Sequence, residues 1–113
     1  MTTPFEMQTV RRGDAVVVRL KGEFDLTSKH EFEYRMREVL DQRCGSLVLD
    51  LRQLTFIDST GLGFVLELWS RCRRNGSDYF VVRAPDGVHQ VFETTGLDRE
   101  LPIIDSLPEG APT

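Results

Sequence analysis

An apolar strand pattern gives way to a helical pattern near the middle of the chain. The run Leu47–Leu51 is apolar except for Asp50 and suits a strand buried on both faces. Beyond it, apolar residues recur at helical spacing, at positions 62, 65, 66, 69 and 72. The change of period predicts that Asp58, Ser59 and Thr60 stand at a loop-to-helix junction.

The other strand patterns predict a mixed sheet. Residues 5–10 and 15–20 are typical of a hairpin around Gly13-Asp14, where glycine and aspartate supply turn chemistry. Residues 79–82 predict another short apolar strand. Residues 101–104 predict a last edge strand, because proline is tolerated there and not in a central strand.

Two further helices are predicted around the central one. Ser28 with Glu31 forms the pattern of a capping box, followed by an apolar stripe at positions 32, 36, 39 and 40 and a stop at Gly45. Another helix begins at Pro85 and ends at Gly96. Helices that alternate with strands imply right-handed parallel crossovers. The sequence therefore predicts an α/β fold: a small single domain with a mixed four- to five-stranded sheet and helices packed on it.

Length and composition exclude several classes of function. With 113 residues the chain is long enough for one domain, which we place at residues 1–107, with a flexible tail at 108–113. A net charge of −4 argues against direct nucleic-acid binding, and no apolar stretch approaches membrane-spanning length. The polar start lacks the features of a signal peptide, so we expect a cytoplasmic protein with Cys44 and Cys72 as reduced thiols.

The junction suits modification better than catalysis. A hydroxyl at the positive end of a helix dipole is a position where added phosphate is well accommodated. The sequence around Ser59 lacks the Gly-x-Ser-x-Gly pattern of a nucleophile elbow, and only His89 follows it as a possible base. We interpret His89 as a structural or solvated histidine, and His30 has no metal-ligand partner at suitable spacing. The glycines match neither a dinucleotide fingerprint nor a Walker loop. We therefore predict no enzyme activity, cofactor or metal.

Three motifs in order resemble those of a known family. Asp58–Gly63, with Gly22–Asp25 upstream and Phe92–Leu97 downstream, is similar to STAS domains of the bacterial anti-sigma factor antagonist type. The resemblance implies that Ser59 is phosphorylated by a partner that is both serine kinase and anti-sigma factor. It also implies that the unphosphorylated protein binds this anti-sigma factor and releases the sigma factor. A serine phosphatase would restore the unphosphorylated form.

The resemblance also indicates which residues near Ser59 belong to the site. Asp25 and Asp58 match acidic positions of the family. Asp25 is assigned to the partner-facing loop, where it would help to orient Ser59 or its kinase. Alternatively, each of the two aspartates only caps a helix. For Thr60 a cap or first-turn role is preferred to a second phosphorylation site. The predicted partner-binding residues are Asp25, Asp58, Thr60, Gly61, Leu62, Gly63 and Phe64.

Two exposure predictions concern the helix after Ser59. Gly61 and Gly63 are expected to leave the backbone of its first turn uncovered, which favours close approach of a partner. Counting about 100° per residue, Phe64 projects away from the apolar stripe, so we expect it to be exposed, with Leu68 extending the same patch.

One alternative function stays open. A STAS domain also serves as a non-phosphorylated adaptor in stressosome-like or transporter-associated complexes, and Ser59 would then be a helix cap only. The sequence after Leu107 departs from the family, because the usual final amphipathic helix is shortened or missing. This departure leaves the oligomeric state open and does not affect the junction.

Overall fold

The computed structural model describes residues 3–108, which form one mixed sheet with helices. The strands are β1 (Glu6–Arg12), β2 (Ala15–Phe24), β3 (Ser46–Ile57), β4 (Asp78–Val82) and β5 (Ile103–Ile104). The helices are the short 3₁₀ helix η1 (Leu26–Ser28), α1 (Lys29–Asp41), α2 (Ser59–Asn75), α3 (Asp86–Thr95) and α4 (Leu97–Glu100). The sheet order is β1-β2-β3-β4-β5, with β1 antiparallel to β2 and the other pairs parallel. The predicted fold class is confirmed.

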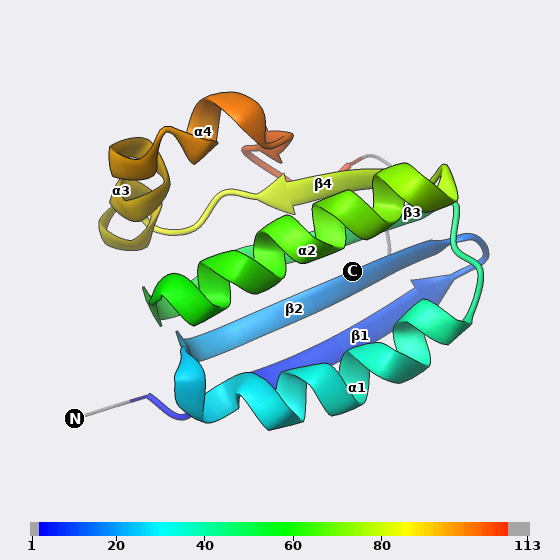
Figure 1. Ribbon diagram of the computed structural model, residues 1–113, viewed down its shortest axis with the longest axis horizontal. Helices are drawn as coiled ribbons and strands as arrows, with labels where there is room; N and C mark the ends of the chain where they lie inside the picture. Colours follow the sequence, from blue (N-terminus) through cyan, green and yellow to red (C-terminus); the bar gives the residue numbers. More distant parts are fainter. Residues whose placement is uncertain (1–2, 109–113) are drawn as a thin grey trace.

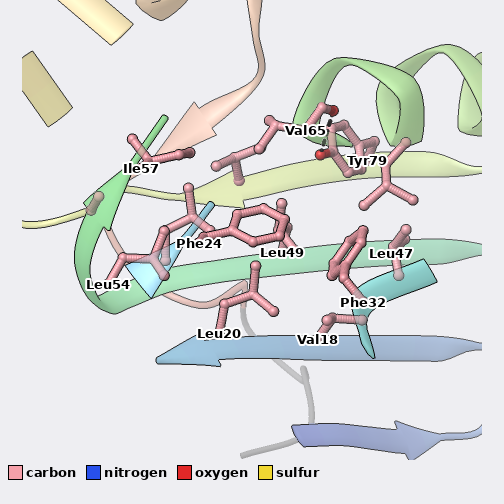
Figure 2. Close-up of a cluster of buried hydrophobic side chains, with 14 of the residues drawn as sticks. Val18, Leu20, Phe24, Phe32, Leu47, Leu49, Leu54, Ile57, Val65 and Tyr79 are labelled. Carbon is pink, nitrogen blue, oxygen red and sulfur yellow. Dashed lines mark hydrogen bonds between the residues drawn. The ribbon is translucent and has the colours of Figure 1, made fainter. Parts of the chain in front are cut away.

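The main core lies between the sheet and two long helices. α1 and α2 cover the same face of the sheet, whereas α3 and α4 lie at the β4 side (Figure 1). Leu47, Leu49 and Leu51 of β3 point toward these helices and are fully buried, as Figure 2 shows for the first two. The Tyr79 hydroxyl donates a hydrogen bond of 2.9 Å to the Val65 carbonyl (Figure 2). Burial raises the pKa of Tyr79 well above its ordinary value.

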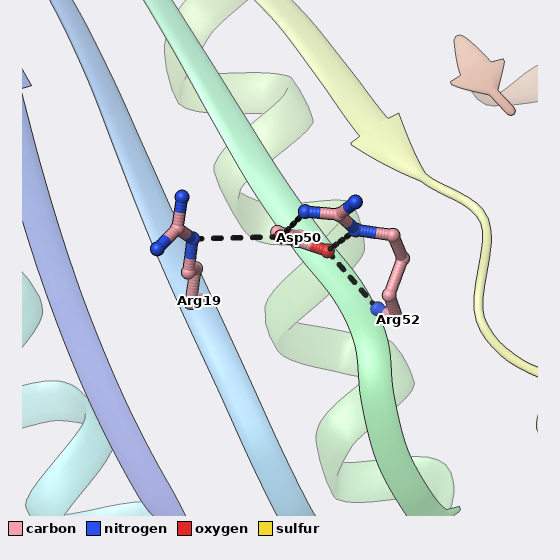
Figure 3. A network of polar contacts seen from close by, with 3 residues as sticks. All are labelled: Arg19, Asp50 and Arg52. Atoms are coloured by element: carbon pink, nitrogen blue, oxygen red, sulfur yellow. Dashed lines mark hydrogen bonds and ion pairs between the residues drawn. The ribbon is translucent and has the colours of Figure 1, made fainter. Parts of the chain in front are cut away.

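The opposite face of the sheet carries a smaller apolar cluster and a buried carboxylate. Val17, Val48 and Val82 are buried there beneath Phe80, Ile104 and Leu107. Asp50 of β3 is 4% exposed and lies between two arginines (Figure 3). Arg52 donates two hydrogen bonds to its oxygens, at 3.0 and 2.8 Å, and Arg19 lies 3.7 Å away. Paired charges of this kind make a buried carboxylate tolerable.

Helix α2 is rotated relative to the prediction. Its buried residues are Gly61, Val65, Leu68 and Cys72. Leu68 is only 2% exposed, and Phe64 is half-buried with its ring 4.8 Å from Phe32 and 5.9 Å from Phe24. The predicted exposure of Phe64 and Leu68 is therefore wrong. The reason is that α2 packs against α1 as well as the sheet, so its buried surface is wider than a single stripe.

The capping box also lies elsewhere than predicted. Asp25 caps η1, and the Ser28 side chain accepts the hydrogen bond from the Asp25 N–H at 2.9 Å. Ser28 makes no side-chain cap bond to α1, and Glu31 is exposed. The capping box is therefore formed by Asp25 and Ser28 around η1, and not by Ser28 and Glu31 at the start of α1. Ser28 is already engaged with Asp25, so its side chain is not used to cap α1.

The carboxyl-terminal part of the described chain contains the last strand of the sheet. The predicted edge strand is confirmed by β5, which pairs with β4 in parallel. The predicted tail at 108–113 lies, except for Pro108, outside the described residues. None of the helices within residues 3–108 is long and apolar enough to cross a membrane.

The buried thiol of Cys72 gives a prediction for alkaline pH. Burial raises the pKa of Cys72 to about 11 from its ordinary value of 9.0. Between these values the unfolded chain loses the thiol proton while the folded chain keeps it. The free energy of unfolding should therefore fall by up to about 1.4 kcal/mol per pH unit. Urea unfolding of the wild type and Cys72→Ala from pH 8 upward measures this, and equal slopes in the two proteins would contradict the prediction.

Candidate functional site

The site forms where two parallel strands end side by side. β2 and β3 are adjacent, and Phe24 pairs with Ile57 at their carboxyl ends. The residues that follow, Asp25 and Asp58, therefore emerge at the same edge of the sheet. η1 and the start of α2 both lie there, on the left in Figure 1. The carboxyl edge of parallel strands is the usual place for functional sites in such folds.

The Asp58 side chain forms hydrogen bonds both to the start of α2 and to η1, which follow β3 and β2. Its Oδ1 accepts a hydrogen bond of 3.0 Å from the Gly61 N–H and caps α2, and its Oδ2 accepts one of 3.2 Å from the Leu26 N–H. The Asp58 N–H in turn donates to the Phe24 carbonyl at 3.3 Å. The helix-cap interpretation of Asp58 is confirmed. Both of its carboxylate oxygens are engaged, so its main effect is to hold the loops in one arrangement.

Asp25 stabilises the neighbouring loop in the same way. Its Oδ1 accepts hydrogen bonds from the Thr27 N–H at 3.0 Å and from the Thr27 hydroxyl at 2.5 Å. No hydrogen bond joins Asp25 to Ser59 within residues 3–108. Direct orientation of Ser59 by Asp25 thus stays a prediction, and the observed role of Asp25 is to shape the loop beside it.

Ser59 is exposed at the first position of α2. Its hydroxyl has no hydrogen-bond partner in the described part of the chain, because Asp58 already supplies the cap. The helix that follows has 17 residues, so the start of α2 carries a substantial positive partial charge. Thr60 is half-buried in the same first turn, which agrees with the predicted first-turn role.

The two glycines of the motif have different environments. Gly61 is buried, and a Cβ atom there would lie 2.5 Å from the Phe24 carbonyl oxygen and 2.8 Å from Ile57 Cγ1. The prediction that the backbone of Gly61 is uncovered is therefore wrong. Because Gly61 has no side chain, α2 can approach β2 closely at this point. Gly63 is exposed, and a Cβ atom there would have nothing within 4 Å of it, which confirms the expectation for that residue.

A groove runs between α1 and α2 from the site. Its volume is about 580 Å³. Apolar side chains of Phe32, Met36, Phe64 and Leu68 line it together with the charged residues Lys29, Glu33, Arg37, Glu67 and Arg71. Thr60 and Gly63 belong to the same lining. Phe64 thus lies in a groove next to Ser59 and not on an open surface; its role in partner binding stays a prediction.

Sequence reasoning missed one residue of this surface. Leu26 is 64% exposed, and its N–H is held by Asp58 next to Ser59. An apolar side chain in the capping turn Asp25-Leu26-Thr27 was the available signal, since such turns normally carry polar residues. A single exposed leucine is ordinary on a protein surface, so it is the position of Leu26 beside Ser59 that makes it a candidate contact.

The chain belongs to the STAS domain family, whose model matches residues 6–110. Within that family it is an anti-sigma factor antagonist. It is 32% identical, over 94% of its length and 90% of the relative's, to the anti-sigma F factor antagonist of Paenibacillus polymyxa. These antagonists are regulatory proteins and not enzymes, and the relatives favour this interpretation over the adaptor.

Solved structures of antagonists share the fold. An anti-sigma factor antagonist from Mycobacterium paratuberculosis superposes with a TM-score of 0.83 at 23% identity, covering 95% of this chain and 92% of that one. Unphosphorylated SpoIIAA gives a TM-score of 0.75 at 24% identity, covering 94% of this chain and 90% of that one. The phosphorylated form of Bacillus SpoIIAA gives 0.69 at 23% identity, covering 94% of each chain.

Proposed function

We propose that Ser59 is the phosphorylation switch of this anti-sigma factor antagonist. In the unphosphorylated state the chain binds an anti-sigma factor that is also a serine kinase, and the sigma factor is released. The kinase phosphorylates Ser59 and ends the interaction, and a serine phosphatase restores it. The whole cycle takes place in the cytoplasm, without direct contact of this chain with nucleic acid or membrane. The proposal rests on the exposed hydroxyl of Ser59 at the start of α2, which has no hydrogen-bond partner within residues 3–108.

The surroundings of Ser59 suit a kinase substrate. The loops on either side are held by Asp58, so the hydroxyl is presented from a fixed backbone. Free N–H groups in the first turn of a helix are good partners for a phosphate. Phosphorylation therefore adds charge without requiring the domain to unfold, and its effect is confined to the surface that meets the partner.

The partner-binding surface combines apolar and acidic groups. Leu26 and Ser59 lie on the exposed edge, Gly63 leaves an open stretch of helix backbone, and Phe64 lies in the groove beside it. Asp25 and Asp58 give this edge a negative charge, which a phosphate on Ser59 increases. The partner must therefore tolerate the two carboxylates and reject the additional charge.

Phosphorylation at Ser59 is tested by intact mass after incubation with ATP and the anti-sigma kinases of the same organism. The wild type should gain one phosphate, Ser59→Ala should gain none, and Thr60→Val should gain one. Phosphate on Ser59→Ala but not on Thr60→Val would place the switch at Thr60 and overturn the assignment. If no kinase modifies the wild type while it still forms stable complexes, the switch proposal is wrong.

Leu26→Ala is expected to lower the affinity for the anti-sigma partner by at least about tenfold. The side chain is exposed, so its removal should change the free energy of unfolding by no more than about 0.5 kcal/mol. Tyr34 on α1 is similarly exposed, at 68%, and does not line the groove. Tyr34→Ala is therefore the matched control. Titration calorimetry that gives Leu26→Ala and Tyr34→Ala the same affinity would exclude Leu26 from the interface.

A further inference from the structure

A second cluster of ionisable groups lies on α3 and α4. His89 and Glu93 are separated by one turn of α3, so both face the same side. Gly96 then adopts a left-handed conformation, with φ of 77°, and the turn brings Asp98 of α4 back toward them. A ring nitrogen of His89 and one carboxylate oxygen each of Glu93 and Asp98 lie within 4.8 Å of one another.

Two members of this cluster have polar atoms without a hydrogen-bond partner in the described part of the chain. The His89 side chain is 7% exposed and has no hydrogen-bond partner among residues 3–108. Oδ1 of Asp98 is inaccessible to solvent and also accepts no hydrogen bond in the described part of the chain. A buried carboxylate oxygen is nearly always paired, so the unpaired Oδ1 of Asp98 in this cluster requires an explanation.

The electrostatics of the cluster favour a cation. Glu93 and Asp98 bring two negative charges, and neither has a lysine or arginine within ion-pair distance in residues 3–108. The cluster also lies near the carboxyl end of α3, where the helix dipole is negative, and the last turn of α3 contains no basic residue. A positive charge at this point would compensate the charges of Glu93 and Asp98 and the negative end of the α3 dipole.

We propose that His89, Glu93 and Asp98 bind a divalent transition-metal ion such as Zn²⁺. An imidazole nitrogen with two carboxylate oxygens is a donor set that suits zinc and its neighbours, whereas magnesium and calcium prefer oxygen ligands alone. Three protein ligands leave a coordination position for water. The ion would join α3 to α4 and so fix the segment that leads through Leu101 to β5. Binding of the ion requires nothing of Ser59.

Glu93→Gln is the decisive variant because Glu93 is exposed and its change leaves the core intact. Titration of the full chain with Zn²⁺, and with Co²⁺ followed by visible absorption, should show one site per chain. Glu93→Gln should weaken it by at least about tenfold. Glu100→Gln, an exposed charge change on α4, is the matched control and should bind as the wild type does. Excess Zn²⁺ at a hundred times Kd should raise the Tm by on the order of 10 °C.

Three results would overturn the metal site. The first is the absence of saturable binding of Zn²⁺ and of Co²⁺ below about 1 mM. The second is equal affinity in the wild type and Glu93→Gln. The third is binding that survives in Asp98→Asn but is lost in Cys44→Ser, which would assign the metal to the thiol. Retention of binding by His30→Gln excludes the exposed histidine as the ligand.

Discussion

Phosphorylation of Ser59 is expected to lower the affinity of this antagonist for its anti-sigma partner by about a thousandfold, or roughly 4 kcal/mol. A phosphate adds a charge of about −2 at neutral pH. The interface that buries a neutral hydroxyl would then have to desolvate this charge beside Asp25 and Asp58. Because the fold is held by its core, the loss should appear in binding and not in stability.

Titration of the anti-sigma kinase with the phosphorylated and unmodified chains measures this loss. Ser59→Ala serves as the control, since it removes the phosphate acceptor but adds no charge, and it should bind within about threefold of the wild type. Ser59→Asp carries a smaller charge than phosphoserine and should fall between the two. Equal affinity of the phosphorylated and unmodified chains would show that Ser59 lies outside the interface.

Gly61→Ala is expected to destabilise the fold by about 3 kcal/mol. The new Cβ would lie 2.5 Å from the Phe24 carbonyl oxygen and 2.8 Å from Ile57 Cγ1. The contact with the carbonyl is a contact with backbone, so a change of side-chain rotamer does not relieve it. α2 would have to move away from β2, and the hydrogen bond from the Gly61 N–H to Asp58 would be strained.

Gly63→Ala is the matched control for this prediction, because it lies two residues away in the same helix with open space around it. It should stabilise the protein by about 0.5–1 kcal/mol through helix propensity. Urea unfolding of the two variants gives the comparison. A Gly61→Ala protein as stable as the wild type would contradict the packing seen at the start of α2. If Gly63→Ala weakens partner binding while raising stability, the partner contacts the helix at that position.

The sequence predicted the junction at Ser59 and the succession of strands and long helices along the chain, because both depend on local pattern. The run Leu47–Leu51 and the period that follows it are enough to place Asp58 as a cap. The exposure of Phe64 was predicted wrongly, because nearly every face of α2 near its start carries an apolar or small residue. Only the packing of α2 against Phe24 and Phe32 decides which way the helix is rotated.

Contacts between residues that are distant in the sequence could not be predicted from local sequence patterns. The hydrogen bond from Leu26 to Asp58 joins residues 32 positions apart, and it depends on β2 and β3 lying side by side. The convergence of His89 with Asp98 depends on the left-handed turn at Gly96 and on the short helix α4, which sequence analysis did not predict. In both cases the residue types are ordinary, and their positions in the fold give them their roles.

Release of the sigma factor tests the central claim most directly. The antagonist is added to a preformed complex of the anti-sigma kinase with a fluorescently labelled sigma factor, and anisotropy reports the free sigma factor. We predict that the unmodified chain and Ser59→Ala displace the sigma factor, and that the chain phosphorylated at Ser59 does so only at concentrations about a thousandfold higher. Displacement at the same concentration by the phosphorylated and unmodified chains would contradict a switch at Ser59.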